Sequence, residues 1–368
     1  MTDNSNTHGR SKATRPSGYP HRVLVNCLKI RRPNTGLHQF CLQLGKALIR
    51  RADPAREELY FYVPKEWRRP FGPDQNYFSH HAFHKNWLPG TSKFQVWHST
   101  YQNSRHLPPR GRTRMVLTVH DLNFLIEEPP TSRKRRHYLT EIQRSIDRSD
   151  HVACISNYTR DCVREYFRLG DKPIEVIYNG CAMDETPEFD QPSYRPEVPF
   201  IFSLGTLLPK KNFHVLPALL RGNDYQLLIA GSGDSDYADN IFREARGHGV
   251  ENRLRFLGAI TEPEKFWYYR HCLAFAFPSL AEGFGLPVVE AMQYGKPVFL
   301  STHASMLEIG GDAAYYFTSF DPDHMQWVFH EAMAVHDDAR AATVRGHVSK
   351  FSWERAADEY LRIYRQWG

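Results

Sequence analysis

The chain has 368 residues, which is too long for one ordinary hydrophobic core and suits two α/β domains. Hydrophobic residues make up 41% of the chain and are mixed with charge, which excludes a disordered protein, and no apolar run approaches the roughly 20 residues that cross a bilayer. Residues 1–180 carry 30 Lys and Arg against 16 Asp and Glu, whereas residues 181–368 carry 17 Lys and Arg against 25 Asp and Glu. The two halves are therefore expected to bind different partners. The acidic second half argues against nucleic acid as a partner.

The chain begins with a polar stretch. Residues 1–20 include Arg10, Lys12 and Arg15 and lack the apolar core of a signal peptide, so they are predicted to form a disordered tail. The six cysteines show neither CxxC pairing nor a metal-ligand spacing with histidine, which is typical of reduced, mostly buried thiols. Together these features predict a cytoplasmic protein.

Strand-like and helical segments alternate along residues 21–180, which are predicted to form the first domain. The expected strands are Val23–Leu28, Leu59–Val63, Phe94–His98, Met115–Val119, His151–Ile155 and Ile174–Tyr178. The expected helices are Leu37–Arg50, Ser132–Asp147 and Tyr158–Phe167. Such alternation predicts a parallel sheet with helices on both faces.

A second alternating unit occupies residues 200–350 and is predicted to form the second domain. Its expected strands are Phe200–Leu204, Tyr225–Ala230, Leu254–Leu257, Leu273–Phe277 and Pro297–Leu300, and its expected helices are Asn212–Leu220, Ser235–His248, Pro263–His271, Leu286–Tyr294 and Asp323–Val335. Between the units, residues 181–199 combine prolines with acidic residues, as an exposed linker does. A last helix within residues 351–368, Ser352–Gln366, begins at an expected N-cap, Ser352.

The most informative stretch of the second unit is residues 278–292. In it, Glu282 and Glu290 lie on either side of a glycine-bearing turn, which follows an apolar strand and opens a helix with a proline in its first turn. Backbone N–H groups at such a turn, here at Gly285 and Leu286, carry partial positive charge and suit a diphosphate. Carboxylates before and after the turn can hold hydroxyl groups of a sugar and of a ribose. The stretch therefore predicts half of a nucleotide-sugar site.

Two adjacent lysines, Lys210 and Lys211, follow the first strand of the second unit. They come after the turn at Gly205, near the carboxyl end of a strand, where open α/β sheets bind ligands. A diphosphate leaving group gains negative charge as a glycosidic bond breaks, and cations at this place would stabilise it. The alternative is two solvated lysines at the start of a helix, which the helix dipole disfavours.

The first unit offers His120, which directly follows a hydrophobic strand. Because strand ends face the crevice between domains in this architecture, its side chain is expected where a sugar could lie. The alternative is a structural histidine that caps the next loop. Asp121, the next residue, either shares the functional role or satisfies backbone donors.

Isolated glycines and one acidic triplet give weaker signals. Gly36 lies in a turn before a helix, and Gly258 follows a strand of the second unit, but a lone glycine is equally well explained as an ordinary turn. The triplet Asp234-Ser235-Asp236 is the nearest match to a metal-binding DxD pair. Its position after a glycine turn predicts a helix N-cap instead, so the site is predicted to be independent of metal.

These motifs resemble those of the retaining GT-B glycosyltransferases of the glycogen-synthase-like group, the glycosyl transferases group 1, which includes bacterial mannosyltransferases. The similarity extends from about Val23 to Tyr364, and the stretch EGFGLPVVE is its most specific part. The resemblance implies a GT-B fold, in which two Rossmann-like parallel-sheet domains face each other across a cleft and a C-terminal helix crosses back.

The resemblance also implies a role for each candidate residue. In this group the first glutamate contacts hydroxyls of the donor sugar and the second holds the ribose, so Glu282 and Glu290 are expected to do the same. His120 would contact the sugar near the reacting carbon, and Lys211 with Lys210 would hold the diphosphate. The backbone contacts expected with the donor are at Gly36, Gly205, Gly258, Gly285 and Leu286. A single glycine at position 36 departs from the pair that the group often has.

The implied activity is the transfer of a hexose, with mannose from GDP-mannose favoured, to a glycan or lipid-linked glycan in cell-surface polysaccharide assembly. The group reacts on one face of the sugar without a covalent nucleophile, so no cofactor is expected. Two alternatives are a nucleotide-sugar 2-epimerase of the same fold and a non-catalytic scaffold that binds a membrane or partner. The combination of EGFGLPVVE with a PKKN turn argues against the epimerase, and the intact site residues argue against the scaffold.

A run of four basic residues, 133–136, begins a helix whose apolar positions recur every four residues. A solvated helix face is the simplest interpretation. The positive balance of this half instead predicts reversible peripheral contact with the anionic inner membrane face, worth about 1 kcal/mol per basic residue. Trp67 and Phe71 either add an aromatic anchor or form an ordinary loop. Without membrane contact, a soluble anionic glycan is the expected partner.

Overall fold

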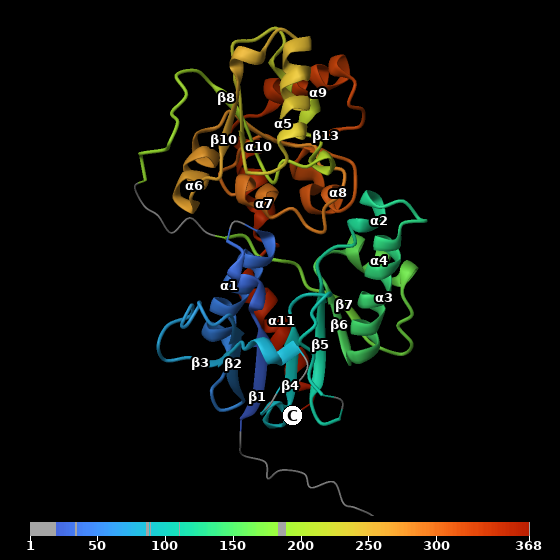
Figure 1. Ribbon diagram of the computed structural model, residues 1–368. Coiled ribbons are helices and arrows are strands. Elements are labelled where there is room, and N and C mark those ends of the chain that lie inside the picture. The colour runs from blue at the N-terminus through green and yellow to red at the C-terminus, as the bar shows by residue number, and fades with distance from the viewer. Residues whose placement is uncertain are drawn as a thin grey trace, which may run out of the picture.

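The structure is a computed structural model and describes residues 20–33, 35–85, 88, 90–109, 111–182 and 189–367. Figure 1 shows two lobes, each built on one sheet. The predicted N-terminal tail lies, except for its last residue, outside the described residues.

The first lobe contains a seven-stranded parallel sheet in the order β3-β2-β1-β4-β5-β6-β7. Its strands are β1 (His21–Asn26), β2 (Glu57–Val63), β3 (Asn76–Ser79), β4 (Val96–Ser99), β5 (Arg114–Val119), β6 (His151–Cys154) and β7 (Ile174–Val176). Its α-helices are α1 (Gly36–Arg51), α2 (Phe124–Glu127), α3 (Arg133–Arg148) and α4 (Asn157–Tyr166), and its 3-10 helices are η1 (Leu28–Arg31), η2 (Ala82–Lys85) and η3 (Thr91–Lys93).

The second lobe contains a six-stranded parallel sheet in the order β10-β9-β8-β11-β12-β13. Its strands are β8 (Phe200–Leu204), β9 (Gln226–Ala230), β10 (Leu254–Gly258), β11 (Ala274–Phe277), β12 (Val298–Ser301) and β13 (Tyr315–Phe317). Its α-helices are α5 (Ser235–Gly247), α6 (Glu262–His271), α7 (Leu286–Met292), α8 (Met306–Gly310), α9 (Pro322–Val335) and α10 (Asp338–Val348), and its 3-10 helices are η4 (Pro209–Lys211), η5 (Phe213–Leu220), η6 (Glu251–Arg253) and η7 (Gly311–Ala313).

Helices cover both faces of the first sheet. Alternate residues of β1 point to opposite faces, so Val23 and Val25 belong to the same hydrophobic cluster as α1, and Leu24 belongs to the cluster that includes Ile142 of α3. A strand buried on both faces needs a continuous apolar run, which explains why the sequence of β1 predicts a strand of a parallel sheet.

In both sheets the chain changes its direction of winding beside the first strand. Strands β2 and β3 lie on one side of β1 and β4 to β7 on the other, and β8 divides the second sheet in the same way. Ligands of open α/β sheets bind at the carboxyl ends of the strands beside such a switch point. The carboxyl ends of β1, β4, β8 and β11 are therefore where a ligand site is expected.

The last helix, α11 (Trp353–Arg365), returns to the first lobe (Figure 1). The side chain of Ser352 caps it, as predicted. The hydroxyl oxygen of Tyr364 is 2.7 Å from Nδ1 of His98 in β4, and the hydroxyl oxygen of Tyr360 is 2.8 Å from Oγ1 of Thr118 in β5. The helix therefore completes the first lobe, as the resemblance to GT-B proteins implied.

The chain crosses between the lobes twice, and the two crossings touch each other. The N–H of Cys181 donates to the carbonyl oxygen of Phe351 at 3.0 Å. A Cβ atom built on Gly180 would collide with the backbone nitrogen of Trp353. A side chain at position 180 would therefore force the two crossings apart.

Gly283 marks a point where the lobes meet beside the cleft. A Cβ atom built on it would collide with the carbonyl oxygen of His120. The hydroxyl of Ser156 donates to the carbonyl oxygen of Gly283 at 2.7 Å, and the carboxylate of Glu308 accepts the N–H of Asn157 at 2.7 Å. These contacts hold the strand-end histidine of one lobe against the glutamate-bearing turn of the other.

The structure adds detail to two predictions for the second half. The predicted helix Asn212–Leu220 is present over residues 213–220 as the 3-10 helix η5, in which Pro217 has no N–H to donate. The described residues 189–199 of the predicted linker are largely exposed, and the N–H of Ser193 fastens them to the second lobe by donating to Glu264 of α6 at 2.9 Å. Its residues 183–188 lie outside the described part of the chain.

Several short elements have no prediction in the sequence. Strand β13 has three residues, and α10 buries only Val344 and Val348, so neither gives a clear periodic pattern. Trp67 and Phe71, the residues of the suggested aromatic anchor, are half-buried, and their role toward a membrane stays a prediction. Phe71 packs on Phe61 with 4.4 Å between ring centroids, and Trp67 lies 5.5 Å from the ring of His38, so both belong to the packing of the first lobe.

Candidate active site

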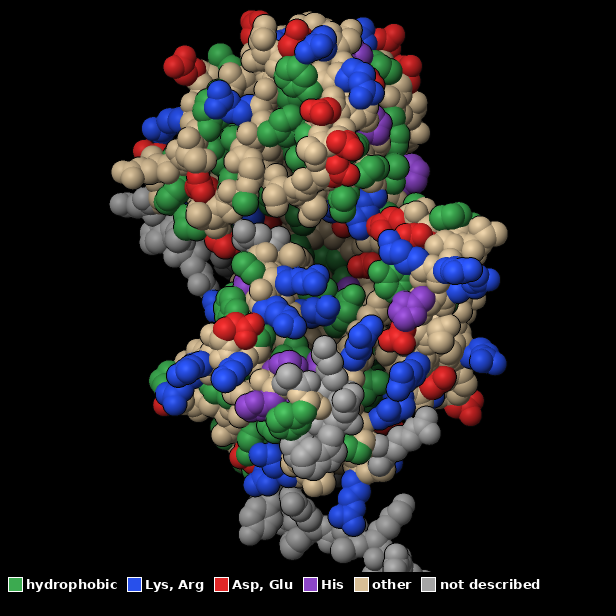
Figure 2. Space-filling view, in the orientation of Figure 1, with side chains coloured by type: hydrophobic (Ala, Val, Ile, Leu, Met, Phe, Trp, Pro, Cys, Tyr) green, Lys and Arg blue, Asp and Glu red, His purple; other side chains and the backbone are tan. Residues whose placement is uncertain are grey.

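A cleft of about 410 Å³ lies between the lobes, and Figure 2 shows the molecule hollowed at this place. Carboxyl ends of strands from both sheets border it, as the two switch points require. Nine of the ten predicted site residues line the cleft: His120 and Gly36 from the first lobe, and Gly205, Lys210, Lys211, Glu282, Gly285, Leu286 and Glu290 from the second. Gly258 does not line it, although its neighbours Ala259 and Ile260 do.

Lys211 and Glu282 form an ion pair inside the cleft. The ammonium of Lys211 donates to Oε1 of Glu282, which also accepts the hydroxyl of Ser279 at 2.8 Å. Both charged side chains are 14% exposed, so they are shielded but reachable from the cleft. The turn after β8 and the loop after β11 thus present a cation and a carboxylate next to each other, where a sugar and its phosphate could be bound together.

Lys210 reaches across the cleft to the other lobe. Its ammonium donates to Oε1 of Glu127, in α2, at 2.6 Å. Burial lowers the pKa of the Lys210 ammonium, but the bond to Glu127 outweighs burial and the pKa is raised. Lys210 is therefore positively charged at neutral pH, and its ammonium is already paired with Glu127. A phosphate that binds Lys210 would compete with this carboxylate. The sequence did not identify Glu127, because the pair joins two lobes.

Glu290 lies at the inner end of the cleft and is held from two sides. Its Oε1 accepts the ammonium of Lys265 at 3.0 Å, and its Oε2 accepts the hydroxyl of Tyr269 at 3.1 Å. The side chains of Lys265 and Glu290 are only 7% and 4% exposed. Burial lowers the pKa of Lys265, but the carboxylates of Glu290 and Glu262 prevail and raise it. Lys265 is therefore a cation at neutral pH, and its bond together with that of Tyr269 fixes the orientation of Glu290.

His120 follows β5 and is buried at the wall of the cleft. Its Nε2 lies 2.8 Å from the carbonyl oxygen of Thr100, which can only accept, so Nε2 carries the proton. Burial lowers the pKa of His120 to about 4, against a smaller opposite effect of the Thr100 carbonyl. The ring is therefore neutral at physiological pH. Its Nδ1 is then an acceptor, which suits the hydroxyl of a sugar.

The glycine turns differ in what they require. Gly285, at φ +100°, caps α7 in a left-handed conformation, which favours glycine. Gly231 packs on the carbonyl oxygen of Gly205 and donates its own N–H to Gly258 at 2.7 Å. Gly36 starts α1, and a Cβ atom built on it would meet nothing within 4 Å. Space alone therefore does not demand glycine at position 36.

Two amide side chains line the cleft that the sequence did not identify. Asn179 is 3% exposed, and its Oδ1 has no hydrogen-bond partner in the structure. Oε1 of Gln39, on α1, is also buried without a partner. A buried polar atom without a partner costs about 1–3 kcal/mol. Both amides are therefore candidates to bind a ligand in the cleft.

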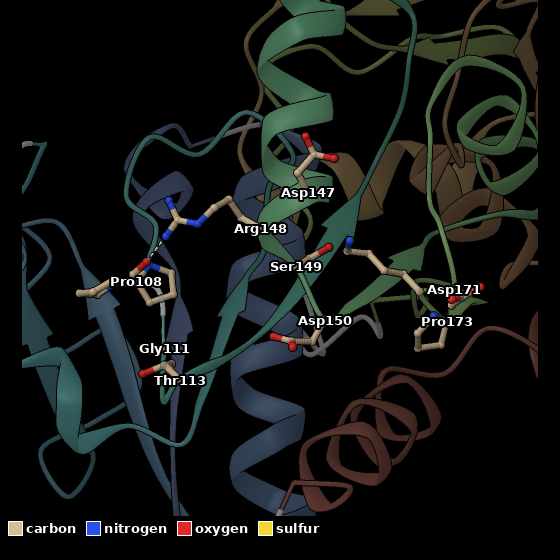
Figure 3. A pocket seen from close by; sticks show the side chains of 11 residues that line it. Pro108, Gly111, Thr113, Asp147, Arg148, Ser149, Asp150, Asp171 and Pro173 are labelled. Carbon is tan, nitrogen blue, oxygen red and sulfur yellow. Dashed lines mark hydrogen bonds between the residues drawn. The ribbon is translucent and has the colours of Figure 1, made fainter.

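A second cavity of about 500 Å³ lies on the first lobe (Figure 3). Its lining residues Thr113, Asp150 and Pro173 immediately precede β5, β6 and β7, so it lies at the amino ends of these strands, away from the cleft. The guanidinium of Arg148 donates to the carbonyl of Pro108 across it. No predicted site residue lines this cavity, and we assign the active site to the cleft.

The structure places the acidic triplet and the cysteines as the sequence predicts. The carboxylate of Asp234 caps α5 by accepting the N–H of Asp236 at 2.9 Å, as predicted for the DxD-like triplet. Within the described ranges, no His, Cys, Asp and Glu side chains come together in threes to hold a metal ion. In those same ranges, no helix has both the length and the hydrophobicity to cross a membrane. All six cysteines are free, and five of them are buried.

Only part of the basic run 133–136 is free at the surface. The ammonium of Lys134 pairs with Glu128 at 2.5 Å, and Arg135 donates to two backbone carbonyls at the end of α2. Lys134 and Arg135 therefore join α3 to the end of α2, whereas Arg133 and Arg136 are exposed.

The chain matches the profiles of two families over neighbouring stretches. Residues 37–185 match the family described as Glycosyltransferase Family 4. Residues 184–342 match the family described as Glycosyl transferases group 1. The first profile covers most of the first lobe, and the second covers the sheet of the second lobe with every cleft residue of that lobe.

Individual proteins give the same result. The chain is 27% identical over 288 residues to the O-antigen chain mannosyltransferase B of Escherichia coli, covering 72% of this chain and 74% of that protein. It is 28% identical to the serotype-specific mannosyltransferase WbdA of Escherichia coli but spans only 29% of that protein. The sucrose-phosphate synthase of Thermosynechococcus elongatus has the same fold, with a TM-score of 0.69 at 18% identity over 94% of this chain and 98% of that one. HepE of Anabaena, in complex with UDP and glucose, also has a TM-score of 0.69, at 16% identity over 93% and 98%.

Two facing parallel sheets, with a C-terminal helix that returns to the first lobe, define the GT-B class of proteins. The chain belongs to the glycosyltransferases of this fold, in the mannosyltransferase-like group.

Proposed function

We propose that the protein transfers mannose from GDP-mannose to a glycan or lipid-linked glycan acceptor in cell-surface polysaccharide assembly, with retention of configuration and without a metal ion. The observation that carries this proposal is the cleft itself, in which His120 of one lobe faces the pair of Lys211 and Glu282 of the other. The similarity to an O-antigen mannosyltransferase supports the choice of sugar and pathway.

The donor diphosphate would lie between the lysines and the glycine turn. Lys211 and the N–H groups of Gly285 and Leu286 are placed on one side of the cleft, and the start of α1 lies on the other. Charge on the leaving phosphate grows as the glycosidic bond breaks, so these donors stabilise the transition state more than the ground state. Catalysis would then consist of positioning and leaving-group stabilisation, with the leaving phosphate helping to deprotonate the acceptor.

The nucleoside and the sugar would occupy the two carboxylate positions. Glu290, oriented by Lys265, would accept hydrogen bonds from the hydroxyl groups of the ribose. Because the acceptor is a carboxylate, these bonds would be charge-assisted. Glu282 would accept hydroxyls of the sugar, and the neutral His120 would accept another. The unpartnered amide of Asn179 is a further donor and acceptor on the same wall.

The proposal also includes cytoplasmic location and peripheral contact with an anionic membrane. Arg133 and Arg136 at the start of α3 support it, together with the basic balance of residues 1–180. Such attraction is screened within about 8 Å at physiological salt, so the variant Arg133→Gln/Arg136→Gln should bind less to anionic vesicles at low salt and equally little to neutral ones. Wild-type protein that ignores anionic vesicles at low salt would contradict the membrane contact.

The direct test is a nucleotide-sugar assay on the purified chain. GDP-mannose, UDP-glucose, UDP-galactose and UDP-N-acetylglucosamine would be incubated with it separately, with and without a chelator, and the released nucleoside diphosphate measured. We expect release from GDP-mannose, unchanged by the chelator, and its loss in Glu290→Gln. Release from another donor alone would refute mannose, and chelator sensitivity would refute independence from metal. With a mannoside acceptor, the one-bond carbon–proton coupling at the anomeric carbon of the product would report retention or inversion.

A further inference from the structure

A second group of cations lies beside the cleft, on the first lobe. Lys29, Arg31 and Arg32 occupy the turn between β1 and α1, and Arg31 and Arg32 are exposed. The N–H of Arg32 donates to the carbonyl oxygen of Lys29 at 3.2 Å, so these residues are three apart on a 3-10 turn. Residues three apart on such a turn lie on the same side. Lys29 and Arg32 therefore lie on the same side of the turn, and Arg31 is next to Arg32 along the chain.

The position of this turn is fixed against the active site. The hydroxyl of Thr35, which lines the cleft, donates to the carbonyl oxygen of Arg32 at 2.8 Å. The ammonium of Lys29 lies 3.8 Å from the ring centroid of Tyr101. Tyr101 directly follows Thr100, whose carbonyl oxygen holds His120. The cations thus border the cleft on the side of the strand-end histidine. Figure 2 shows Lys and Arg side chains gathered on the first lobe beside the hollow.

Without a bound anion, the clustering of Lys29, Arg31 and Arg32 costs free energy, because the cations repel one another. Among the ion pairs of the described residues, none joins a carboxylate to Lys29, Arg31 or Arg32. Burial lowers the pKa of the Lys29 ammonium, and repulsion from Arg32 and Arg31 lowers it further. Other basic residues of this lobe are neutralised, as Lys134 is by Glu128. An anion bound at the turn would remove both the repulsion and the desolvation cost.

We infer that Lys29, Arg31 and Arg32 form a subsite for a phosphate group of the acceptor. This inference rests on the proposed function, because it assigns a substrate to the same cleft. The donor diphosphate has its own cations, Lys210 and Lys211, on the second lobe, whereas Lys29 neighbours His120 on the first lobe. Two guanidinium groups offer the forked donors that match phosphate oxygens. The acceptor is therefore a sugar linked to phosphate, carried either on a lipid diphosphate or on a soluble chain.

The test is binding of inorganic pyrophosphate to protein that is already saturated with GDP, so that the donor phosphate position is filled. The readout is the melting temperature at constant ionic strength. For wild type, we expect pyrophosphate at about ten times its Kd to raise it by about 2–4 °C. Arg31→Gln/Arg32→Gln should lose this rise, and Lys29→Met, which keeps its stem on Tyr101, should lose part of it.

The matched control is Arg133→Gln/Arg136→Gln, which removes the same charge from the same lobe and should keep the full rise. A rise retained in Arg31→Gln/Arg32→Gln, or absent in wild type, overturns the inference. Both arginines are exposed and repel Lys29, so their removal should not lower the melting temperature without pyrophosphate. Farnesyl diphosphate in place of pyrophosphate distinguishes a lipid-linked acceptor from a soluble phosphorylated acceptor. A larger rise than with pyrophosphate indicates a lipid-linked acceptor, and an equal rise indicates a soluble phosphorylated one.

A donor assay distinguishes failure of this inference from failure of the proposed function. Arg31→Gln/Arg32→Gln should hydrolyse GDP-mannose at the wild-type rate, because the subsite does not hold the donor. If wild type hydrolyses no nucleotide sugar, the proposed function fails, while the pyrophosphate experiment still reports on the subsite. Reduced donor hydrolysis in the double variant would show that the cations serve the donor and would overturn the assignment to the acceptor.

Discussion

Replacing Lys265 by methionine should leave the buried carboxylate of Glu290 without a neighbouring cation. Methionine fills a similar volume but removes the cation 3.0 Å from Oε1, so that the hydroxyl of Tyr269 is the one partner left among the described residues. Removing one member of a buried ion pair typically costs about 3–5 kcal/mol, because the remaining charge is uncompensated. We expect Lys265→Met to reduce the free energy of unfolding of the second lobe by about that amount, measured by urea denaturation at pH 7.5.

The two members of this pair are not equivalent, which makes the prediction specific. Lys265 has a second carboxylate, Glu262, at 2.9 Å, whereas Glu290 has no second cation among its bonds in the structure. Glu290→Gln should therefore cost less than Lys265→Met, about 1–3 kcal/mol. The double variant should recover about 2 kcal/mol relative to Lys265→Met alone, because no charge is left stranded. A larger loss in Glu290→Gln than in Lys265→Met would refute this reasoning.

The pH dependence gives an independent check on Lys265→Met. Without its cation, Glu290 is a buried acid whose folded pKa lies above its unfolded value, since burial raises the pKa of this carboxyl. The folded state then binds more protons than the unfolded state between the two values, and stability falls as pH rises through that range. The deficit of Lys265→Met relative to wild type should therefore shrink between pH 7.5 and pH 5.5. A constant deficit would mean that packing, and not charge, is responsible.

The remaining predictions concern the cleft and its walls. Lys211→Ala should lower kcat more than it raises KM for the donor, because the charge it meets grows in the transition state, and an effect on KM alone would contradict this. Glu127→Gln should tighten nucleoside diphosphate binding severalfold in calorimetry, because Lys210 no longer has a competing carboxylate. Gly283→Ala should force the lobes apart at the carbonyl of His120 and cut turnover at least tenfold while each lobe stays folded by circular dichroism. Acid should destabilise the first lobe as pH falls from about 6.5 towards 4, because burial holds the folded pKa of His120 near 4 and that of His98 near 3, and stability unchanged over this range would show that neither is buried as described.

The sequence predicted both sheets and most of the cleft, because each depends on local pattern. A strand buried on both faces has a continuous run of apolar residues, which can be recognised in the sequence. The carboxyl ends of parallel strands lie at the same edge of the sheet. That is why His120, Lys211 and Glu282 could be placed in one cleft before any coordinates. Their roles toward the donor stay predictions.

What the sequence could not predict depends on how distant elements pack. Lys265 reaches Glu290 because α6 lies against α7, and 25 residues separate them along the chain. Glu127 meets Lys210 only because the lobes close on each other. The tautomer of His120 depends on the carbonyl of Thr100, which directly follows the neighbouring strand β4. Pairing across helices, strands or lobes leaves no spacing signal in a single sequence.

The return of α11 to the first lobe makes that lobe discontinuous along the chain. Tyr360 and Tyr364 are fully buried and bond to Thr118 and His98 inside the first sheet, and Arg51 pairs with Asp358 at 2.8 Å. A fragment that ends after β7 would therefore expose the core surface that the last helix covers. During synthesis, the first lobe cannot be completed until α11 has left the ribosome. The lobe that is made first is thus the lobe that is finished last.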